Sequence, residues 1–370
     1  MTTREKVKIP KRFIEKYGDD LKIWSFSKIN TYRQCIYEYY LSRIKKVEGK
    51  DNIYTACGAV THSIIEDFYN GKIKYEEMAD KFDSEFLDIE VSDYRFSSDK
   101  EKNDRMRKKY KECVKHFFKT HNVITTKVLL EQLIWIDIGE GNLFYGYIDL
   151  ITKDKEGNYH VIDWKTSTVY TGKKIKENAR QLQLYALGLH QLGVPIEKIK
   201  AAWNFIKYVN ISYKQKNGKI KTTRAERNNW VKKIKTSLRR DIIQFYNCEG
   251  WEADLKVEEC IKNNSLDNLD KEIQDRYILN DCYVYVDISE NDFENLKKEF
   301  KYVINEINKR GENEENWLRE EIKPEEEYYC SVLCSVSSHC PYYKKMLELK
   351  GIKEKEEDEL LKLLEEELPF

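Results

Sequence analysis

Residues 143–166 read L-F-Y-G-Y-I-D-L-I-T-K-D-K-E-G-N-Y-H-V-I-D-W-K-T, and they decide the fold that we predict. Residues 144–152 and 159–165 are rich in Ile, Val and Tyr, which is typical of β-strands. Between them, residues 153–158 are polar and contain Gly157, which indicates a turn. The sequence therefore predicts a β-hairpin at the centre of the fold.

The predicted hairpin brings three charged side chains together. Because side chains alternate along a strand, Asp163 and Lys165 project from the same face, and the turn can bring Asp149 beside Asp163. Two carboxylates and one ammonium in one pocket suit the binding of a divalent metal and the activation of a water molecule. A D-x-K pair by itself is more often a solvated salt bridge, so the flanking sequence has to support the site.

Two predicted helices carry further polar side chains. His62 and Glu66 stand four residues apart in an apolar periodic stretch, so they share one helical face. Gln181 and Tyr185 have the same spacing in a helix predicted over residues 178–192. These four side chains can therefore extend the pocket of the hairpin.

Taken together, the motifs resemble those of the PD-(D/E)XK nuclease superfamily, in the branch with the RecB and AddB nuclease domains and the CRISPR-associated DNA-end exonucleases. The matching elements are His62 with Glu66, G-Y-I-D ending at Asp149, V-I-D-W-K ending at Lys165, and Q-L-Q-L-Y from Gln181 to Tyr185. The resemblance implies an α/β fold with a restriction-endonuclease-like core, in which helices flank a central mixed sheet. It also implies helical insertions, a C-terminal cysteine cluster segment, and DNA as the substrate.

The resemblance implies a metal site on the hairpin. Asp149 and Asp163 would bind Mg²⁺ or Mn²⁺ through their oxygens, which agrees with the hairpin geometry. His62 and the backbone carbonyl of Trp164 would be further ligands. A histidine beside carboxylates favours Mn²⁺ over Mg²⁺.

The same resemblance implies roles for the other motif residues. Lys165 would orient the attacking water and stabilise charge on the phosphate. Glu66 would bind a second metal or a metal-bound water. Gln181 and Tyr185 would position the scissile strand or support Lys165.

A cysteine cluster lies near the C-terminus. Cys330, Cys334 and Cys340 fall within eleven residues, and three thiolates need a fourth ligand to close a metal centre. In the resembling branch an early cysteine joins three late ones around a [4Fe–4S] cluster, which implies that Cys35 is the fourth ligand. The late spacing here is C-x3-C-x5-C, whereas the branch usually has C-x2-C-x5-C. Zinc on the same sulfurs, His339 in place of one cysteine, or three unrelated thiols are alternatives.

A basic stretch covers residues 207–240, which hold twelve Lys and Arg residues and one acid, Glu226. Tyr208, Tyr213 and Trp230 are interleaved with these cations. Cations and aromatic rings together suit single-stranded DNA, whose phosphates need positive charge and whose bases can stack. The alternative is an exposed basic surface without a partner. The cations expected to bind DNA are Lys232, Lys233, Lys235, Arg239 and Arg240.

Composition limits the class of protein. The chain has 370 residues, of which 41% are apolar and 35% charged, and no apolar run approaches the ~20 residues that span a bilayer. Nine cysteines without an export signal predict a reducing, cytoplasmic environment. Because the net charge is zero, a surface for nucleic acid has to be a local patch.

Five segments are expected along the chain. The predicted segments are a polar N-terminal arm (1–23), a nuclease core (24–213), a basic hairpin and helical insertion (214–310), a connector with the cysteine cluster (311–345), and a charged C-terminal helix (346–370).

The predicted function is that of a metal-dependent, RecB-like DNA exonuclease acting at DNA ends or in single strands, with a role in repair or recombination. The sequence contains no G-x-x-x-x-G-K-[ST] loop, so a helicase or a recombination or replication partner would have to unwind DNA. Alternatives are a non-catalytic DNA-binding or scaffolding protein on a nuclease fold, a zinc-stabilised endonuclease, and a metal–sulfur sensor or adaptor.

Overall fold

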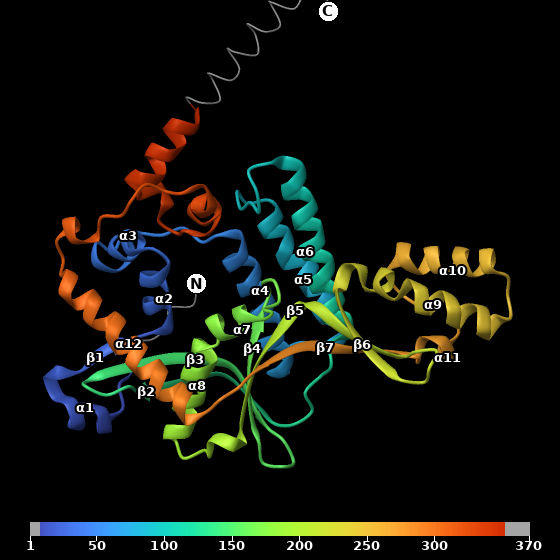
Figure 1. Ribbon diagram of the computed structural model, residues 1–370, viewed down its shortest axis with the longest axis horizontal. Coiled ribbons are helices and arrows are strands. Elements are labelled where there is room, and N and C mark those ends of the chain that lie inside the picture. The colour runs from blue at the N-terminus through green and yellow to red at the C-terminus, as the bar shows by residue number, and fades with distance from the viewer. Residues whose placement is uncertain (1–7, 352–370) are drawn as a thin grey trace, which may run out of the picture. The chain divides into compact units, whose positions relative to one another are not determined.

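The computed structural model describes residues 8–351 (Figure 1). By internal contacts the chain divides into two compact units. Within the described residues, unit 1 comprises 8–53, 138–144 and 297–351, and unit 2 comprises 54–137 and 145–296. These units do not follow the five segments that we predicted. Of the predicted C-terminal helix, residues 346–351 are helical and residues 352–370 lie outside the described part of the chain.

A mixed sheet forms the centre of unit 2. Its strands are β2 (Val128–Asp137), β3 (Asn142–Lys153, in unit 2 from Tyr145), β4 (Tyr159–Lys165), β5 (Ile199–Lys214), β6 (Ile220–Glu226) and β7 (Tyr277–Val286). The order is β3-β4-β5-β6, with β2 beside β3 and β7 beside β5. β3 and β4 are antiparallel, and β4 and β5 are parallel. The predicted hairpin and the predicted mixed α/β sheet are therefore confirmed.

Helices pack around this sheet within unit 2. They are α4 (Ile53–Tyr69, in unit 2 from Tyr54), α5 (Met78–Glu90), α6 (Lys100–Thr120), α7 (Lys173–Asn178), α8 (Arg180–Gln191), α9 (Trp230–Tyr246), α10 (Gly250–Asn263) and α11 (Lys271–Gln274). The side chain of Asp99 caps the start of α6 by accepting a hydrogen bond from the Lys102 amide at 2.6 Å. The helix α8 makes the crossover that allows β4 and β5 to run parallel.

A glycine sets how closely α8 approaches the sheet. A Cβ atom on Gly188 would lie 2.5 Å from Cδ1 of Ile134 and 2.7 Å from Cγ1 of Ile136, both on β2. Any residue with a Cβ would have to displace these two isoleucine side chains, so glycine allows the close approach. The close packing of α8 on β2 fixes the helix that carries Gln181 and Tyr185.

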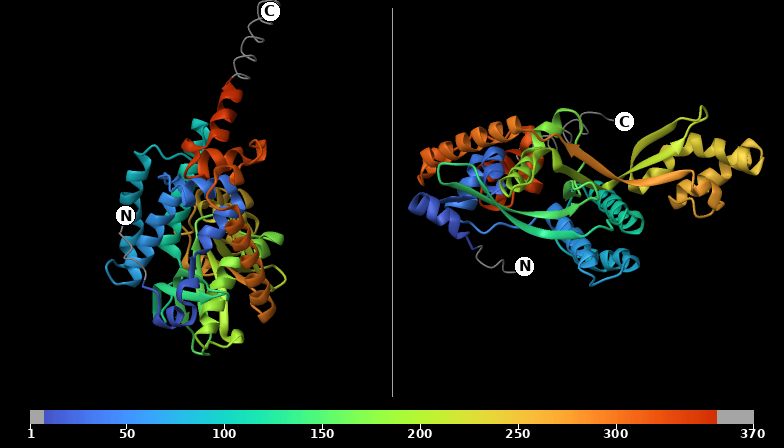
Figure 2. Two further views of the ribbon diagram at one scale, coloured as in Figure 1. Left: turned by 90° about the vertical axis from the view of Figure 1, so that its left-hand side faces the viewer. Right: turned by 90° about the horizontal axis from the view of Figure 1, so that it is seen from below.

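A second apolar core lies between α9, α10, α11 and one face of β5, β6 and β7 (Figure 2). Alternate residues of β5, namely Val209, Ile211 and Tyr213, point into it. Helix α9 supplies apolar residues with helical periodicity, including Val231, Ile234 and Leu238. Helix α9 packs on this face of the strands only and does not cover the opposite face.

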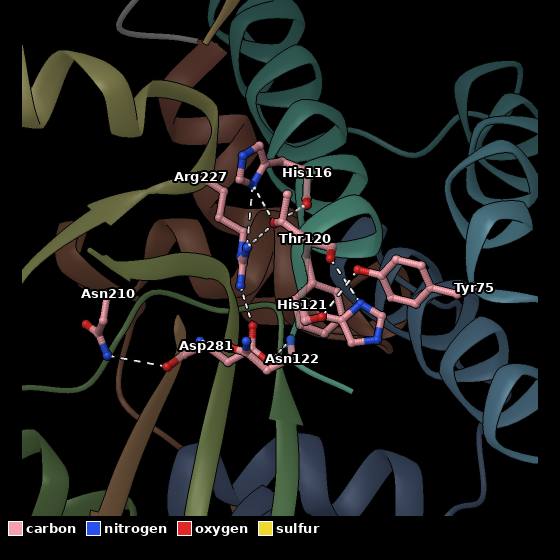
Figure 3. Close-up of polar contacts among 9 residues, drawn as sticks. Tyr75, His116, Thr120, His121, Asn122, Asn210, Arg227 and Asp281 are labelled. Atoms are coloured by element: carbon pink, nitrogen blue, oxygen red, sulfur yellow. Dashed lines mark hydrogen bonds and ion pairs between the residues drawn. The ribbon is translucent and has the colours of Figure 1, made fainter. Parts of the chain in front are cut away.

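A buried ion pair joins α6, the segment before α9, and β7 (Figure 3). Arg227 is 0% exposed and Asp281 is 5% exposed, and Nη2 of Arg227 lies 2.6 Å from Oδ1 of Asp281. The other guanidinium nitrogen, Nη1, donates to Thr120 Oγ1 at 2.8 Å. Oδ2 of Asp281 accepts a hydrogen bond from the Asn122 amide at 3.1 Å. Both charges therefore have partners inside the core, as buried charges require.

We expect unit 2 to lose stability in acid because of His121. Nδ1 of His121 donates to the Phe117 carbonyl at 3.1 Å, while Nε2 is buried and has no hydrogen-bond partner. Burial lowers the pKa of His121 to about 4. Nε2 therefore takes up a proton more readily in the unfolded chain than in the folded protein. The free energy of unfolding is expected to fall between about pH 6.5 and about pH 4, by up to roughly 3 kcal/mol. Urea denaturation at several pH values measures this loss.

The variant His121→Phe isolates this contribution. Phenylalanine keeps the ring that packs against Phe117 but cannot titrate. We expect its free energy of unfolding to depend less on pH than that of the wild type over the same range. Identical pH dependence in the two proteins would contradict the assignment to His121.

Unit 1 contains α1 (Lys11–Tyr17), β1 (Lys22–Trp24), α2 (Phe26–Gln34), α3 (Ile36–Tyr39), the C-terminal part of α12 (Glu290–Arg310), and several short turns. β1 pairs in parallel with residues 142–144 of β3, and Trp24 Nε1 donates to Asn142 Oδ1 at 3.1 Å. Residues 8–23, which we predicted as a polar arm, contain α1, a short helical turn and the start of β1. The periodicity of these short elements was too brief to recognise, and Trp24 is buried only because the strand pairs.

None of the helices in residues 8–351 has the length and apolarity needed to cross a bilayer.

Candidate active site

The hairpin of β3 and β4 brings the three predicted charged residues together. Leu150 pairs with Ile162, and this register places Asp149 opposite Asp163. Nζ of Lys165 lies 2.6 Å from Oδ2 of Asp163, and Asp163 is only 2% exposed. Oδ2 of Asp149 accepts a hydrogen bond from the Trp164 amide at 2.9 Å. The two carboxylates and the ammonium therefore share one buried pocket.

Helix α4 adds His62 to this pocket. Nε2 of His62 lies 3.1 Å from the Trp164 carbonyl oxygen, and Nδ1 lies 3.7 Å from Oδ2 of Asp149. The four groups predicted as metal ligands, His62, Asp149, Asp163 and the Trp164 carbonyl, are thus adjacent. Burial lowers the pKa of His62, so its imidazole is held in the neutral form that binds metals.

Helix α8 supports the lysine. Lys165 Nζ donates to Oε1 of Gln181 at 3.3 Å, and Nε2 of Gln181 donates to the hydroxyl of Tyr185 at 3.1 Å. A Cβ on Gly146 would lie 2.9 Å from Cε1 of Tyr185, so the glycine of G-Y-I-D leaves room for this ring. The chain of contacts from Tyr185 through Gln181 holds the ammonium of Lys165 in place.

The pocket carries an excess of negative charge. Burial and the nearby carboxylate of Asp163 raise the pKa of Asp149 well above its usual value. Burial opposes the charge on Lys165, but the carboxylates of Asp163 and Asp149 outweigh this and raise its pKa. One ammonium thus faces two carboxylates, and a bound cation would relieve their mutual repulsion.

The donor set fits a hard divalent cation. Two carboxylates and a backbone carbonyl supply oxygen, and His62 supplies an imidazole nitrogen, a combination suited to Mn²⁺ or Mg²⁺. Oδ2 of Asp163 is buried and makes no hydrogen bond of acceptable geometry, although the Lys165 ammonium lies beside it. Across residues 8–351, however, no three His, Cys, Asp or Glu side chains converge as a group that could hold a metal ion. Metal binding would therefore require these side chains to move closer together than they lie in the structure.

Two further acids act on the pocket. Glu66, on the same face of α4 as His62, has a pKa raised by burial and by Glu131. Glu131 lies on β2, and its charge also raises the pKa of Asp149. Its φ of +44° is rare for a residue with a side chain, and such strain often marks functional positions. We did not predict Glu131, and the available signal was a lone acid within the apolar strand L-L-E-Q-L.

The four predicted cluster ligands lie around one small cavity in unit 1. Cys35 stands between α2 and α3, and the cavity that it lines is also lined by Cys330, Cys334 and Cys340. Nη1 of Arg319 lies 3.4 Å from the sulfur of Cys35. The cavity measures about 10 Å³, which is room for about one water molecule. As the side chains lie, these cysteines do not form a metal-holding group among the described residues.

The predicted DNA-binding cations of α9 fall into two kinds. Lys232 and Lys233 are exposed. The other three face acids, as Lys235 pairs with Glu258, Arg239 with Asp254, and Arg240 with Asp241, each at 2.6 Å. Two of these acids lie on α10, outside the basic stretch, so the sequence window overstated the positive charge.

The aromatic residues of the basic stretch do not form the expected stacking surface. Tyr213 is 5% exposed and Trp230 is 4% exposed, and both belong to the core beneath α9. The prediction that these two rings stack on DNA bases is therefore wrong. Burial of their large apolar area stabilises the fold more than exposure would.

The family model for the PD-(D/E)XK nuclease superfamily matches residues 23–341, a range that includes every motif residue and all four cluster cysteines. A search of curated proteins found no match. Because the family match covers most of the chain, this protein belongs to the PD-(D/E)XK nuclease superfamily.

Proposed function

We propose that this protein is a metal-dependent DNA nuclease, and that it acts as an exonuclease at DNA ends or in single strands. The observation that carries the proposal is the buried pocket in which Asp149 lies opposite Asp163 and Lys165 contacts Asp163. A phosphodiester anion repels a hydroxide nucleophile, and this donor set could hold the cation that offsets the repulsion.

Four groups would hold Mg²⁺ or Mn²⁺: the carboxylates of Asp149 and Asp163, the imidazole of His62 and the carbonyl of Trp164. A divalent ion there supplies Lewis acidity toward the phosphate and lowers the pKa of a water molecule. Glu66 and Glu131 are the further acids that would orient water or a second cation near the pocket.

Lys165 is the residue that we propose acts directly on the substrate. Its raised pKa keeps the amine protonated, so it can donate hydrogen bonds to the attacking water or to a phosphate oxygen. Gln181 and Tyr185 are positioning residues, because they act through Lys165. Their hydrogen bonds limit the rotation of the ammonium and keep it directed at one point of the pocket.

Resemblance to the RecB and AddB branch supports three finer proposals. The protein would act on DNA in repair or recombination, in the cytoplasm, and with a helicase or another recombination or replication partner that unwinds DNA. A non-catalytic DNA-binding or scaffolding protein is the alternative, but His62, Asp149, Asp163 and Lys165 are all present. No motif residue that hydrolysis requires has been lost.

Digestion of end-labelled linear DNA and closed circular DNA tests the proposal. Purified protein should degrade linear single strands or duplex ends with Mn²⁺ or Mg²⁺, and EDTA should stop the reaction. Circular DNA should resist. Cleavage of circles would identify an endonuclease, and failure to cut any DNA with either metal would overturn the nuclease proposal.

We also propose that Cys35, Cys330, Cys334 and Cys340 hold a structural [4Fe–4S] cluster. The four thiols line one cavity, and a π-helical turn, Tyr329–Leu333, takes up the extra residue of the C-x3-C spacing. Four thiolates favour iron–sulfur or zinc over a catalytic cation and leave no position open for substrate. Burial raises the pKa of Cys330 to about 11, so cluster binding would release protons.

Cys330→Ser is expected to lower the free energy of unfolding by several kcal/mol, since the cluster would close a loop of about three hundred residues. Anaerobically purified wild type should absorb near roughly 400 nm, as clusters with cysteine ligands do. About one zinc per chain would instead support the zinc-stabilised alternative. Cys248→Ser is the matched control, because Cys248 lies outside the cavity. A cysteine metal site would be excluded if the wild type contained neither iron nor zinc and the two variants were equally stable.

A further inference from the structure

The β5–β6 hairpin carries a dense group of exposed cations. Lys214, Lys216, Lys219, Lys221 and Arg224 fall within eleven residues and are all exposed. Among the described residues, none of these four lysines forms an ion pair with an acid, in contrast to Lys235, Arg239 and Arg240 of α9. The positive charge of the basic stretch is therefore concentrated on the hairpin.

One face of the hairpin is open. In the antiparallel register Asn210 pairs with Arg224, Ser212 with Thr222, and Lys214 with Ile220, so these six residues share a face. The other face carries Ile211, Tyr213 and Ala225, which pack in the core beneath α9.

Hydrogen bonds order the open face. The hydroxyls of Ser212 and Thr222 lie 2.9 Å apart, and Nε of Arg224 donates to Oδ1 of Asn210 at 3.4 Å. A polar surface of hydroxyls, amides and cations is therefore held on a rigid pair of strands, which Figure 2 shows at the α9 end of the sheet.

The chemistry of this face fits phosphate and not bases. Residues 214–224 contain no aromatic side chain, and Tyr213 and Trp230 are buried. Binding of single strands commonly relies on aromatic rings that stack on bases, whereas duplex DNA presents phosphates to cations and hydroxyls. We propose that the β5–β6 hairpin binds the phosphate backbone of duplex DNA whose end is in the active site. This inference rests on the proposed nuclease function.

The sheet sets the distance between the hairpin and the active site. Asp163 on β4 pairs with Trp203 on β5, and Lys214 lies eleven residues further along β5. A straight strand rises about 3.3 Å per residue, so the separation is at most about 36 Å. A duplex rises about 3.4 Å per base pair, so the hairpin meets DNA up to about ten base pairs from the cleaved end. A duplex longer than about ten base pairs therefore reaches from the active site to the hairpin, whereas a shorter duplex covers less of that distance.

A pair of charge-reversal variants tests the inference. Lys214, Lys216 and Lys219 are changed together to Glu in one variant, and Lys232, Lys233 and Lys235 in the other. The two changes give the same net charge on elements that share one core, so long-range electrostatics are matched. Binding to blunt duplexes of about 8 and about 30 base pairs is measured in EDTA, which prevents hydrolysis, and at several salt concentrations. Thermal unfolding confirms that both variants fold.

The hairpin variant should bind the long duplex at least about tenfold more weakly than the wild type, and its salt slope should fall by about two to three. Its loss of affinity for the short duplex, which covers less of the distance to the hairpin, should be clearly smaller, and the α9 variant should lose less than about threefold on either DNA. The inference would be overturned if the hairpin variant lost no affinity, or lost the same affinity for both duplex lengths. It would also be overturned if both variants lost affinity equally. If one of these results is found and the wild-type protein still digests DNA, the hairpin inference fails but the nuclease proposal stands.

Discussion

Asp163→Asn is expected to lower the rate of DNA hydrolysis by at least about a thousandfold. The substitution keeps the volume of the side chain but removes the charge that faces Lys165 at 2.6 Å and that would bind the catalytic metal. Lys165→Gln should have an effect of similar size, because no other ammonium group in the described pocket contacts Asp163. Initial rates on end-labelled linear DNA in Mn²⁺ measure both.

A matched control lies on the same hairpin. Asp154 sits in the turn between β3 and β4, pairs with His160 at 2.8 Å and is remote from the pocket in the strand register. Asp154→Asn should digest DNA at close to the wild-type rate. Retained activity in Asp163→Asn or in Lys165→Gln would remove that residue from the proposed chemistry, provided that thermal unfolding shows a folded variant.

Arg227→Ala is expected to destabilise the protein by roughly 3–5 kcal/mol, the usual loss when one partner of a buried ion pair is removed. Asp281 would remain buried with an uncompensated charge, and burial already raises its pKa. Thr120 would also lose its guanidinium partner. Urea denaturation measures the change in the free energy of unfolding.

Arg224→Ala is the control for this prediction, because Arg224 is an exposed arginine three residues upstream. Its loss should cost no more than about 0.5 kcal/mol. The double variant Arg227→Met, Asp281→Leu should recover part of the stability lost in Arg227→Ala, because neither charge then remains in the core. A loss below about 1 kcal/mol in Arg227→Ala would show that the pair is not an important support of unit 2.

The centre of the fold could be predicted from the sequence because its signals are local. The hairpin of β3 and β4 follows from two β-rich stretches and a glycine turn, and these alone place Asp163 and Lys165 on one face. The pairs on α4 and α8 follow from helical spacing. The resemblance then connected these separated motifs, and the family match over residues 23–341 supports that connection.

Other features depend on residues that are distant in the sequence, so only the tertiary structure decided them. The strand β2 brings Glu131 close enough to affect Asp149, although nothing in its local sequence marks it as a site residue. Helix α10 supplies acids that pair with Lys235 and Arg239, which moves the exposed positive charge to the hairpin.

Burial was the property that the sequence described least well. Tyr213 and Trp230 occur among cations, yet both lie in the core because the alternation of β5 and the apolar stripe of α9 turn them inward. The sequence by itself determined the charges, the spacing and the local periodicity that build the candidate active site. The tertiary structure decided which charges are paired and which rings are buried, because pairing and burial depend on neighbours contributed by other parts of the chain.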